Sequence, residues 1–230
     1  MTLKAILFDK DGTLFDFGAT WNNWTMSVID HYSEGSANLA QHIADAIGFD
    51  LAKREFLPSS PIIAGTNREA AELVASALDD ADVDAVELYL AESAENAPLA
   101  PVVPLAPYLT ALRKEGFLLG VVTNDTERNA YTHLNAAGAE GLLDFVAGHD
   151  SGFGAKPDPD PLLAFAKQFD LRPDQVAMVG DSTHDLIAGR RAGMITVGVL
   201  TGMATEDVLA EYADVVLPDI SHIPSWLKDA

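Results

Sequence analysis

The sequence has 230 residues, of which 48% are hydrophobic, and its 14 basic and 35 acidic side chains give a formal net charge of −21. That charge repels the phosphates of nucleic acids and of anionic membranes, so neither is an expected partner. The chain contains no cysteine, which excludes disulfide bonds, thiolate metal sites and a cysteine nucleophile.

No stretch of the sequence approaches the roughly 18 apolar residues that a membrane span needs, and the start shows no basic-then-apolar signal pattern. The length fits one large domain, or a domain with a smaller one inserted into it. We therefore expect a cytoplasmic protein that is a monomer or a homodimer.

Residues 3–8 form a short apolar run, LKAILF, that ends at two aspartates separated by a single lysine. Such a run, bounded by polar residues, predicts a buried β-strand. Asp9 and Asp11 would then lie at the end of this strand, directly before Gly12 and Thr13. Two carboxylates so close together repel each other, so this position needs a counterion.

Residues 17–98 show helical periodicity. They contain no strong strand signal apart from a short Pro-containing stretch near 57–63. The helices expected in this segment lie at 20–33, 37–47, 67–78 and 83–90. We predict that 17–98 is an all-α, four-helix cap domain. It is inserted into an α/β core that is formed by 1–16 and 99–230.

The rest of the chain alternates short apolar runs with helical patterns. Further strands are expected at 118–122, 176–179, 195–199 and 213–217. Helices are expected at 107–115, 126–137, 159–169 and 185–192. This alternation predicts an α/β fold with a Rossmann-like parallel sheet flanked by helices. In such sheets, ligands bind at the carboxyl ends of the strands.

Polar residues gather at these expected strand ends. Thr123 and Asn124 follow one strand, Asp181 and Asp185 follow another, and Lys156 lies in a Gly-rich loop. Each alone has an ordinary explanation as a helix cap, a turn residue or a loop lysine. Together, however, carboxylates in one cavity require a cation, and oxygen ligands favour Mg²⁺. The hydroxyl, amide and ammonium groups would complete a phosphate cradle.

With these residues the chain resembles the haloacid dehalogenase (HAD) superfamily, on the phosphatase branch with a helical cap after the first motif. The four matching motifs are Asp9-Lys10-Asp11-Gly12-Thr13, Thr123, Lys156, and Gly180-Asp181-Ser182-Thr183-His184-Asp185. They occur in order, and the resemblance spans essentially the whole chain. The segments DKDGTLFD, VVTND, KPDPDPLL and GDSTHD are most similar to phosphoglycolate phosphatases and their relatives.

The resemblance implies a magnesium-dependent phosphatase that hydrolyses a small phosphomonoester through an aspartyl-phosphate. Asp9 would be the nucleophile, and Asp11 would be the general acid and base. The residues implied to hold Mg²⁺ are Asp9, Asp11 through its backbone carbonyl, Asp181 and, through the metal's waters, Asp185. The residues implied to bind the phosphoryl group are Gly12, Thr123, Asn124 through its amide, and Lys156, which also neutralises the nucleophile.

Two other functions are compatible with these residues. A sugar phosphomutase of the same superfamily keeps both aspartates and returns phosphate to a sugar rather than to water. A non-catalytic phospho-acceptor module also places acidic residues, a threonine and a lysine at strand ends. Such modules are much shorter than this chain, and their phospho-acceptor lies on a later strand than the acidic pair.

The predicted cap is strongly acidic and has few groups that could receive a second anion of the substrate. Its basic residues are Lys53, Arg54 and Arg68. Thr66 and Glu69 match a capping box at the start of a helix, where an anion is favoured. We therefore predict that Arg68 binds the carboxylate of a substrate such as phosphoglycolate. The alternative is a surface arginine paired with Glu69 or Glu72.

Overall fold

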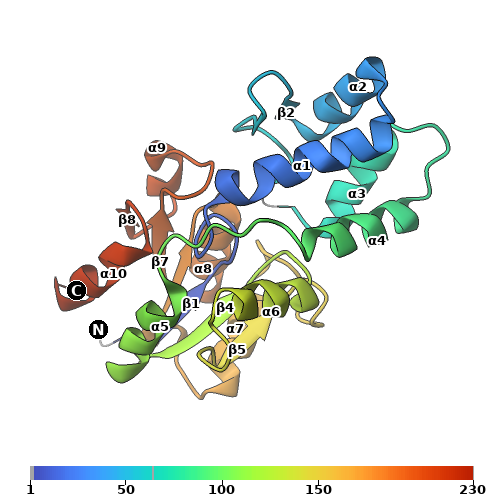
Figure 1. Ribbon diagram of the computed structural model, residues 1–230. Coiled ribbons are helices and arrows are strands. Elements are labelled where there is room, and N and C mark those ends of the chain that lie inside the picture. The colour runs from blue at the N-terminus through green and yellow to red at the C-terminus, as the bar shows by residue number, and fades with distance from the viewer. Residues whose placement is uncertain (1–2, 64, 230) are drawn as a thin grey trace. The chain divides into compact units, whose positions relative to one another are not determined.

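The computed structural model describes residues 3–63 and 65–229, and its centre is a six-stranded parallel sheet (Figure 1). The strand order is β5-β4-β1-β6-β7-β8, with all neighbouring pairs parallel. The strands are β1 (Ala5–Phe8), β4 (Leu118–Val122), β5 (Phe145–Ala147), β6 (Val176–Gly180), β7 (Ile195–Val199) and β8 (Val215–Leu217). The predicted Rossmann-like α/β sheet is therefore confirmed.

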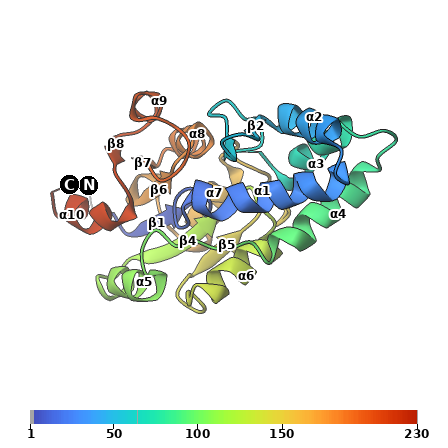
Figure 2. The same ribbon diagram turned by 45° about the horizontal axis from the view of Figure 1, so that its top comes forward.

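Helices cover both faces of this sheet, as Figures 1 and 2 both show. They are α5 (Leu105–Lys114), α6 (Glu127–Ala136), α7 (Asp160–Gln168), α8 (Thr183–Ala192), α9 (Glu206–Ala210) and α10 (Ile223–Asp229). Because strand residues alternate between faces, Ile6 and Phe8 pack in a cluster with Leu109 of α5. Leu7 packs on the opposite face with Phe165 of α7. Burial on both faces explains why the strands are continuous apolar runs.

The pairing register brings the ends of three strands together. Phe8, the last residue of β1, pairs with Val121 of β4 on one side and with Val179 of β6 on the other. The loops that follow β1, β4 and β6 therefore leave the sheet at the same edge. This register places Asp9 between the loops that begin at Thr123 and Asp181.

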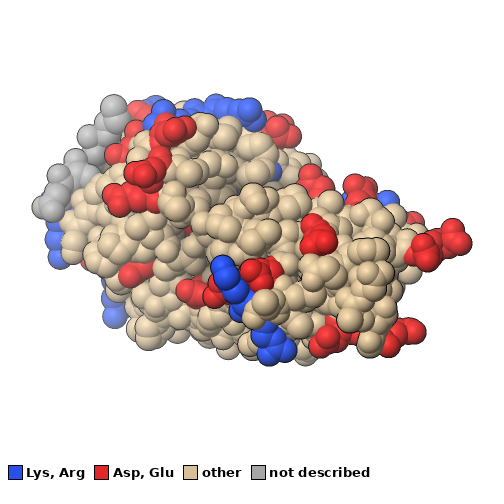
Figure 3. Space-filling model, turned by 90° about the horizontal axis from the view of Figure 1, so that it is seen from above, with Lys and Arg blue, Asp and Glu red and all other residues tan. Residues whose placement is uncertain are grey.

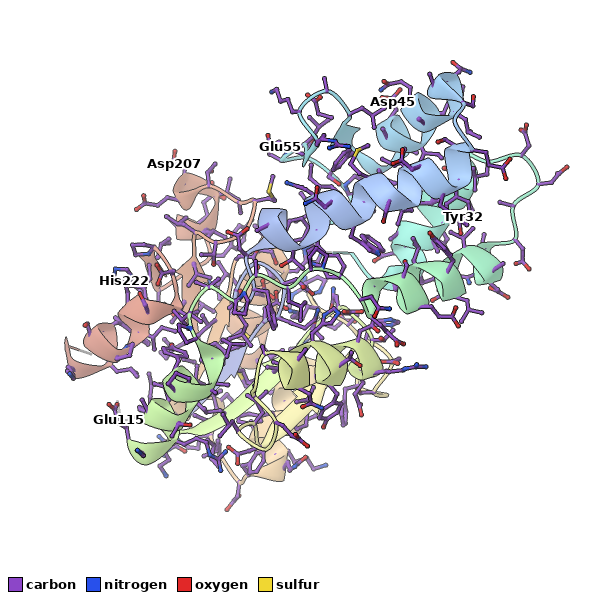
Figure 4. All side chains as sticks on the ribbon, viewed as in Figure 1. Tyr32, Asp45, Glu55, Glu115, Asp207 and His222 are labelled. Atoms are coloured by element: carbon purple, nitrogen blue, oxygen red, sulfur yellow. The ribbon has the colours of Figure 1, made fainter. Side chains whose placement is uncertain are left out.

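The chain divides into two compact units. The first runs to Phe17 and resumes at Leu99, and the second comprises Gly18–Pro98. The helices of the second unit are α1 (Phe17–Ser33), which begins at the boundary, α2 (Ala37–Ile47), α3 (Asn67–Ser76) and α4 (Val83–Ala94). Tyr32 of α1, labelled in Figure 4, packs edge-to-face on Tyr89 of α4 with ring centroids 5.3 Å apart.

Some short elements were not expected from the sequence. A two-stranded antiparallel ribbon, β2 (Phe49–Asp50) with β3 (Glu55–Phe56), interrupts the helices, and the stretch near 57–63 forms turns instead of a strand. Strand β5 and helices α9 and α10 were also missed. Helices α9 and α10 have five and seven residues, which is too short for helical periodicity to identify them.

Charged side chains lie at separate positions on the surface. On the face shown in Figure 3, acidic side chains lie at several positions, and lysine and arginine side chains lie near some of them. Most of that face is neither acidic nor basic. Within the described part of the chain, no helix is both long and apolar enough to cross a membrane.

Candidate active site

The site is centred on Asp9, which immediately follows β1 and is buried. Its backbone amide donates to the carbonyl of Val179 at 2.8 Å, which continues the β1–β6 pairing by one residue. The Lys156 Nζ lies 2.6 Å from Asp9 Oδ1 and 2.7 Å from Asp185 Oδ1. Burial alone would lower the pKa of Lys156, but Asp185 and Asp9 raise it above its ordinary value. The lysine therefore remains a cation that links two loops.

A third carboxylate joins this pair. Asp9, Asp181 and Asp185 each offer an oxygen, and the three oxygens lie within 4.8 Å of one another. Burial raises the pKa of Asp9 to about 7, with Lys156 opposing and Asp185 adding to the shift. Burial and the charges of Asp9 and Asp185 raise the pKa of Asp181 well above its usual range. These shifts show that ionised carboxylates are costly at this buried site, a cost that a cation would relieve.

Two glycines allow the backbone to approach the Asp181 carboxylate closely. Gly12 has φ +85°, a conformation that favours glycine, and a Cβ built on it would overlap the Asp181 carboxylate. A Cβ on Gly202 would overlap the same group. The Thr201 hydroxyl donates to the Gly12 carbonyl at 2.6 Å, and the Thr13 hydroxyl donates to Asp181 Oδ1 at 3.3 Å. The backbone thus comes close to the carboxylate from two loops.

The loop after β4 contributes Thr123 and Asn124, both buried. The Thr123 amide donates to the Ala147 carbonyl at 2.9 Å, and its hydroxyl accepts from the Asp125 amide at 3.1 Å. The Asn124 side chain pairs twice with the backbone of Lys156: it donates to the carbonyl at 2.9 Å and accepts from the amide at 2.9 Å. Asn124 therefore fixes the backbone from which the lysine extends, a contact that the sequence did not predict.

Asp185 supports the lysine from the other side. Its second carboxylate oxygen, Oδ2, accepts from the Ser182 amide at 3.1 Å and from the Ser182 hydroxyl at 2.6 Å. The bond from the Ser182 amide is part of the capping box that opens α8. Because Oδ1 pairs with Lys156, Asp185 orients the lysine as well as belonging to the carboxylate cluster.

Asp11 lies at the edge of the site with 16% of its side chain exposed, and it contacts a group that sequence reasoning missed. Its Oδ2 lies 2.7 Å from the Nζ of Lys10, which is fully buried and also contacts Asp125 and His133. Two signals in the sequence pointed to this group. Asp125 directly follows the threonine and asparagine of the second motif, and His133 lies on the apolar side of its helix, next to Leu134.

The structure places Arg68 in the helical unit, in a cluster of acidic side chains. Its guanidinium pairs with Asp84 at 2.5 Å, Glu87 at 2.8 Å and Glu72 at 3.2 Å. The predicted capping box is present, with Thr66 as the N-cap of α3. The guanidinium is thus engaged by carboxylates of its own unit. This geometry favours the ion-paired alternative over binding of a substrate anion.

Comparison with known proteins agrees with this arrangement. A model of the haloacid dehalogenase-like hydrolases matches residues 3–193. A phosphoglycolate phosphatase from Rhodospirillum rubrum is 30% identical, over 97% of this chain and 90% of its own length. The pyrophosphatase PpaX from Bacillus velezensis is 27% identical, over 96% of this chain and 94% of its own.

Among solved structures, a hydrolase from Pseudomonas syringae shares the fold with a TM-score of 0.71. It is 21% identical, and the match covers 99% of this chain and 98% of that one. The family match covers most of the chain, and the relatives named as phosphatases match nearly all of it. The chain therefore belongs to the haloacid dehalogenase-like hydrolase family and is an enzyme of the phosphatase type.

Proposed function

We propose that this protein is a magnesium-dependent phosphatase that hydrolyses a small phosphomonoester through an aspartyl-phosphate on Asp9. The observation that carries the proposal is the buried Lys156, whose Nζ lies 2.6 Å from Asp9 at the carboxyl end of the sheet. An anionic nucleophile can approach an anionic phosphate only where a nearby cation offsets the repulsion. Asp11, two residues further on, adds a group that can transfer protons.

The reaction proceeds in two steps. A carboxylate oxygen of Asp9 attacks phosphorus and forms a new P–O bond as the ester P–O bond breaks, while Asp11 donates a proton to the leaving oxygen. Asp11 then takes a proton from a water molecule, whose oxygen attacks phosphorus and displaces Asp9. Water therefore supplies the oxygen of the released phosphate, and both aspartates return to their starting states.

The phosphoryl oxygens would be held by groups from two loops: Thr123 offers its hydroxyl, Asn124 its backbone amide, and Lys156 its ammonium group. The predicted contribution of the Gly12 amide is not favoured, because that amide donates to the Phe15 carbonyl at 2.7 Å. The hydrogen bonds between the Asn124 side chain and the Lys156 backbone support this role, because they hold two of these groups in one rigid unit. Charge-assisted hydrogen bonds of this kind stabilise the negative charge of the transferring phosphoryl group.

The residues around Asp181 fit a divalent cation. Three buried carboxylates share the positive charge of Lys156, the donors are all oxygens, and Gly12 and Gly202 keep side chains away from Asp181. A hard ion such as Mg²⁺ suits this donor set. Asp9, Asp181 and the Asp11 carbonyl would hold the ion, with Asp185 next to it. Bound there, it would supply positive charge that offsets the nucleophile and the phosphate.

The substrate is proposed to be a small phosphate ester of the phosphoglycolate type, with the helical unit as a cap that selects it. The names of two relatives support this class and add pyrophosphate as a second compound to test. A screen of small phosphate esters with MgCl₂, read by release of inorganic phosphate, tests the proposal. A phosphomutase would instead need an activating bisphosphate and would release little phosphate.

Replacing Asp11 with asparagine is expected to lower kcat on an alkyl phosphate by roughly 10²–10⁴-fold, the usual contribution of a general acid–base group. The loss on p-nitrophenyl phosphate should be smaller, because nitrophenolate leaves without needing a proton. Steady-state phosphate release on the two substrates measures the difference. Asp207→Asn changes an exposed aspartate of α9 (Figure 4) and should match the wild type. Full activity of Asp11→Asn would refute the assigned role.

Removing divalent metal with EDTA is expected to stop turnover, and MgCl₂ should restore it. In the absence of substrate, Mg²⁺ at 100 times its Kd should stabilise the fold by about 2.7 kcal/mol. That gain raises Tm by about 2–4 °C for each kcal/mol in a protein of this size. Asp181→Asn should lose most of this rise, whereas Asp207→Asn should keep it. A Tm that does not respond to Mg²⁺ in the wild type would contradict the metal site.

A further inference from the structure

The first motif contains a cation whose side chain is completely buried. Lys10 stands between Asp9 and Asp11 and has no exposed surface. Its Nζ lies 2.7 Å from Asp11 Oδ2, 3.0 Å from Asp125 Oδ2 and 3.0 Å from His133 Nδ1. Burying an ammonium group is costly unless it is paired and hydrogen-bonded, and here it has three partners.

Two of these partners are anchored to helix α6. Asp125 immediately precedes the N-cap of α6, and its Oδ1 accepts from the Thr126 amide at 2.7 Å and from the Asn129 side chain at 3.2 Å. His133 is fully buried on the same helix and packs edge-to-face against Phe15, with ring centroids 6.5 Å apart. Hydrogen bonds and ring packing therefore attach this side of the network to α6.

The chemistry of the contact determines the direction of the hydrogen bond to the histidine. A charged ammonium group only donates hydrogen bonds, so His133 Nδ1 accepts from Lys10. Lys10 thus lies between two carboxylates, Asp11 and Asp125. The contact from Lys10 to Asp11 is shorter than the one to Asp125, and Asp11 is the partner that lies at the edge of the site.

We propose that Lys10 is a positioning residue: held by Asp125 and His133, its ammonium group fixes the Asp11 carboxyl group in the orientation that proton transfer requires. The role rests on the proposed function, in which Asp11 protonates the leaving oxygen and then deprotonates water. A carboxyl group on a loop can rotate about two side-chain bonds, and a misplaced acid–base group loses much of its effect. Lys10 ties that group to the β4–α6 loop, which also carries Thr123 and Asn124.

A double-mutant cycle tests this role. Lys10→Met keeps the length of the side chain and removes its charge. In the wild-type background it should lower kcat on an alkyl phosphate by about 10–100-fold, with KM changing less than about twofold. In the Asp11→Asn background it should cost less than about twofold, because a residue that acts through Asp11 has nothing left to position. Equal losses in both backgrounds would overturn the proposal.

A charge-balanced variant separates positioning from a purely structural role. Lys10→Met alone leaves the partly buried Asp125 carboxylate without its cationic partner, which can destabilise the fold. Lys10→Met combined with Asp125→Asn removes both charges and keeps both shapes. If Lys10 positions Asp11, this variant should keep a Tm near that of the wild type and retain the full loss of kcat. Recovery of wild-type kcat would show that Lys10 only neutralises Asp125, and would overturn the proposal.

Arg113→Met provides the matched control, because Arg113 pairs with Asp144 at 2.8 Å in the same unit and both are partly exposed. Its kcat should equal that of the wild type when rates are expressed per folded molecule. The cycle also distinguishes the two proposals. If Asp11→Asn remains fully active, the acid–base role of Asp11 is refuted. If Asp11→Asn is impaired but its loss and that of Lys10→Met are additive, only the positioning role of Lys10 is refuted.

Discussion

Replacing Asp9 with asparagine or alanine is expected to lower phosphate release by roughly 10⁴-fold or more, since removing a covalent nucleophile leaves only the remaining stabilisation of the transition state. In the proposed mechanism Asp9 attacks phosphorus from a position beside Lys156, whose Nζ lies 2.6 Å from Asp9 Oδ1. Steady-state phosphate release with MgCl₂ measures the loss. The control Asp174→Asn changes an aspartate paired with exposed Arg172 and should retain full activity. Residual activity above about a hundredth of wild type in Asp9→Ala would exclude the covalent role.

The same substitution should not weaken the fold when metal is absent. Burial raises the pKa of Asp9 in the folded state to about 7. At a pH above the ordinary pKa of an aspartate, the ionised Asp9 carboxyl group therefore disfavours the folded state. Asparagine has a similar shape and carries no charge. We therefore expect Asp9→Asn to have a Tm in EDTA at pH 8 that equals or exceeds that of the wild type. A marked fall in Tm would mean that the lost activity reflects damage to the fold.

Replacing Lys156 with methionine is expected to affect both activity and stability. Activity should fall by about 10³-fold or more, because the nucleophile and the phosphate lose the cation between them. The fold should lose about 3–5 kcal/mol, the cost of leaving buried carboxylates without their partner. Lys156 is buried and pairs with both Asp9 and Asp185, so both carboxylates are affected. Phosphate release and denaturant unfolding in EDTA measure the two losses.

The stability loss of Lys156→Met should depend on pH in a defined direction. The pKa of Asp9 is raised by burial to about 7, so protons bind to the folded state as pH falls through that value. Protonation removes the charge that Lys156 balances. The difference in stability between wild type and variant should therefore be smaller at pH 5.5 than at pH 8.

The control for this comparison is Arg172→Met, which breaks an exposed ion pair with Asp174. Exposed pairs contribute about 0–1 kcal/mol, so this variant should unfold close to the wild type at both pH values. If Lys156→Met lost no more stability than Arg172→Met at pH 8, Lys156 would not balance the charge of the carboxylates.

The sequence by itself determined the fold class and the order of the main elements. Strands buried on both faces must be continuous apolar runs, which is why LLGVV at β4 and VAMVG at β6 were recognisable from residue type alone. The capping box of α3 was equally local, since Thr66 and Glu69 bond to each other's backbone amides. Strand β5 and the two strands of the β2–β3 ribbon exist through pairing with a neighbour and left no periodic signal.

Only the tertiary structure decided which charged groups meet. The pairing of β1 with β4 and β6, and of β4 with β5, brings Asp9, Lys156 and Asp185 together from loops far apart in the chain. Long side chains reach several partners, so sequence position suggested Glu72 as a partner of Arg68 but did not reveal Asp84 and Glu87. For the same reason, the sequence marked Lys10 as a motif residue, but only packing against α6 joined it to Asp125 and His133. Local patterns report what each residue does to its own backbone, whereas the charge balance of a buried site depends on distances between loops.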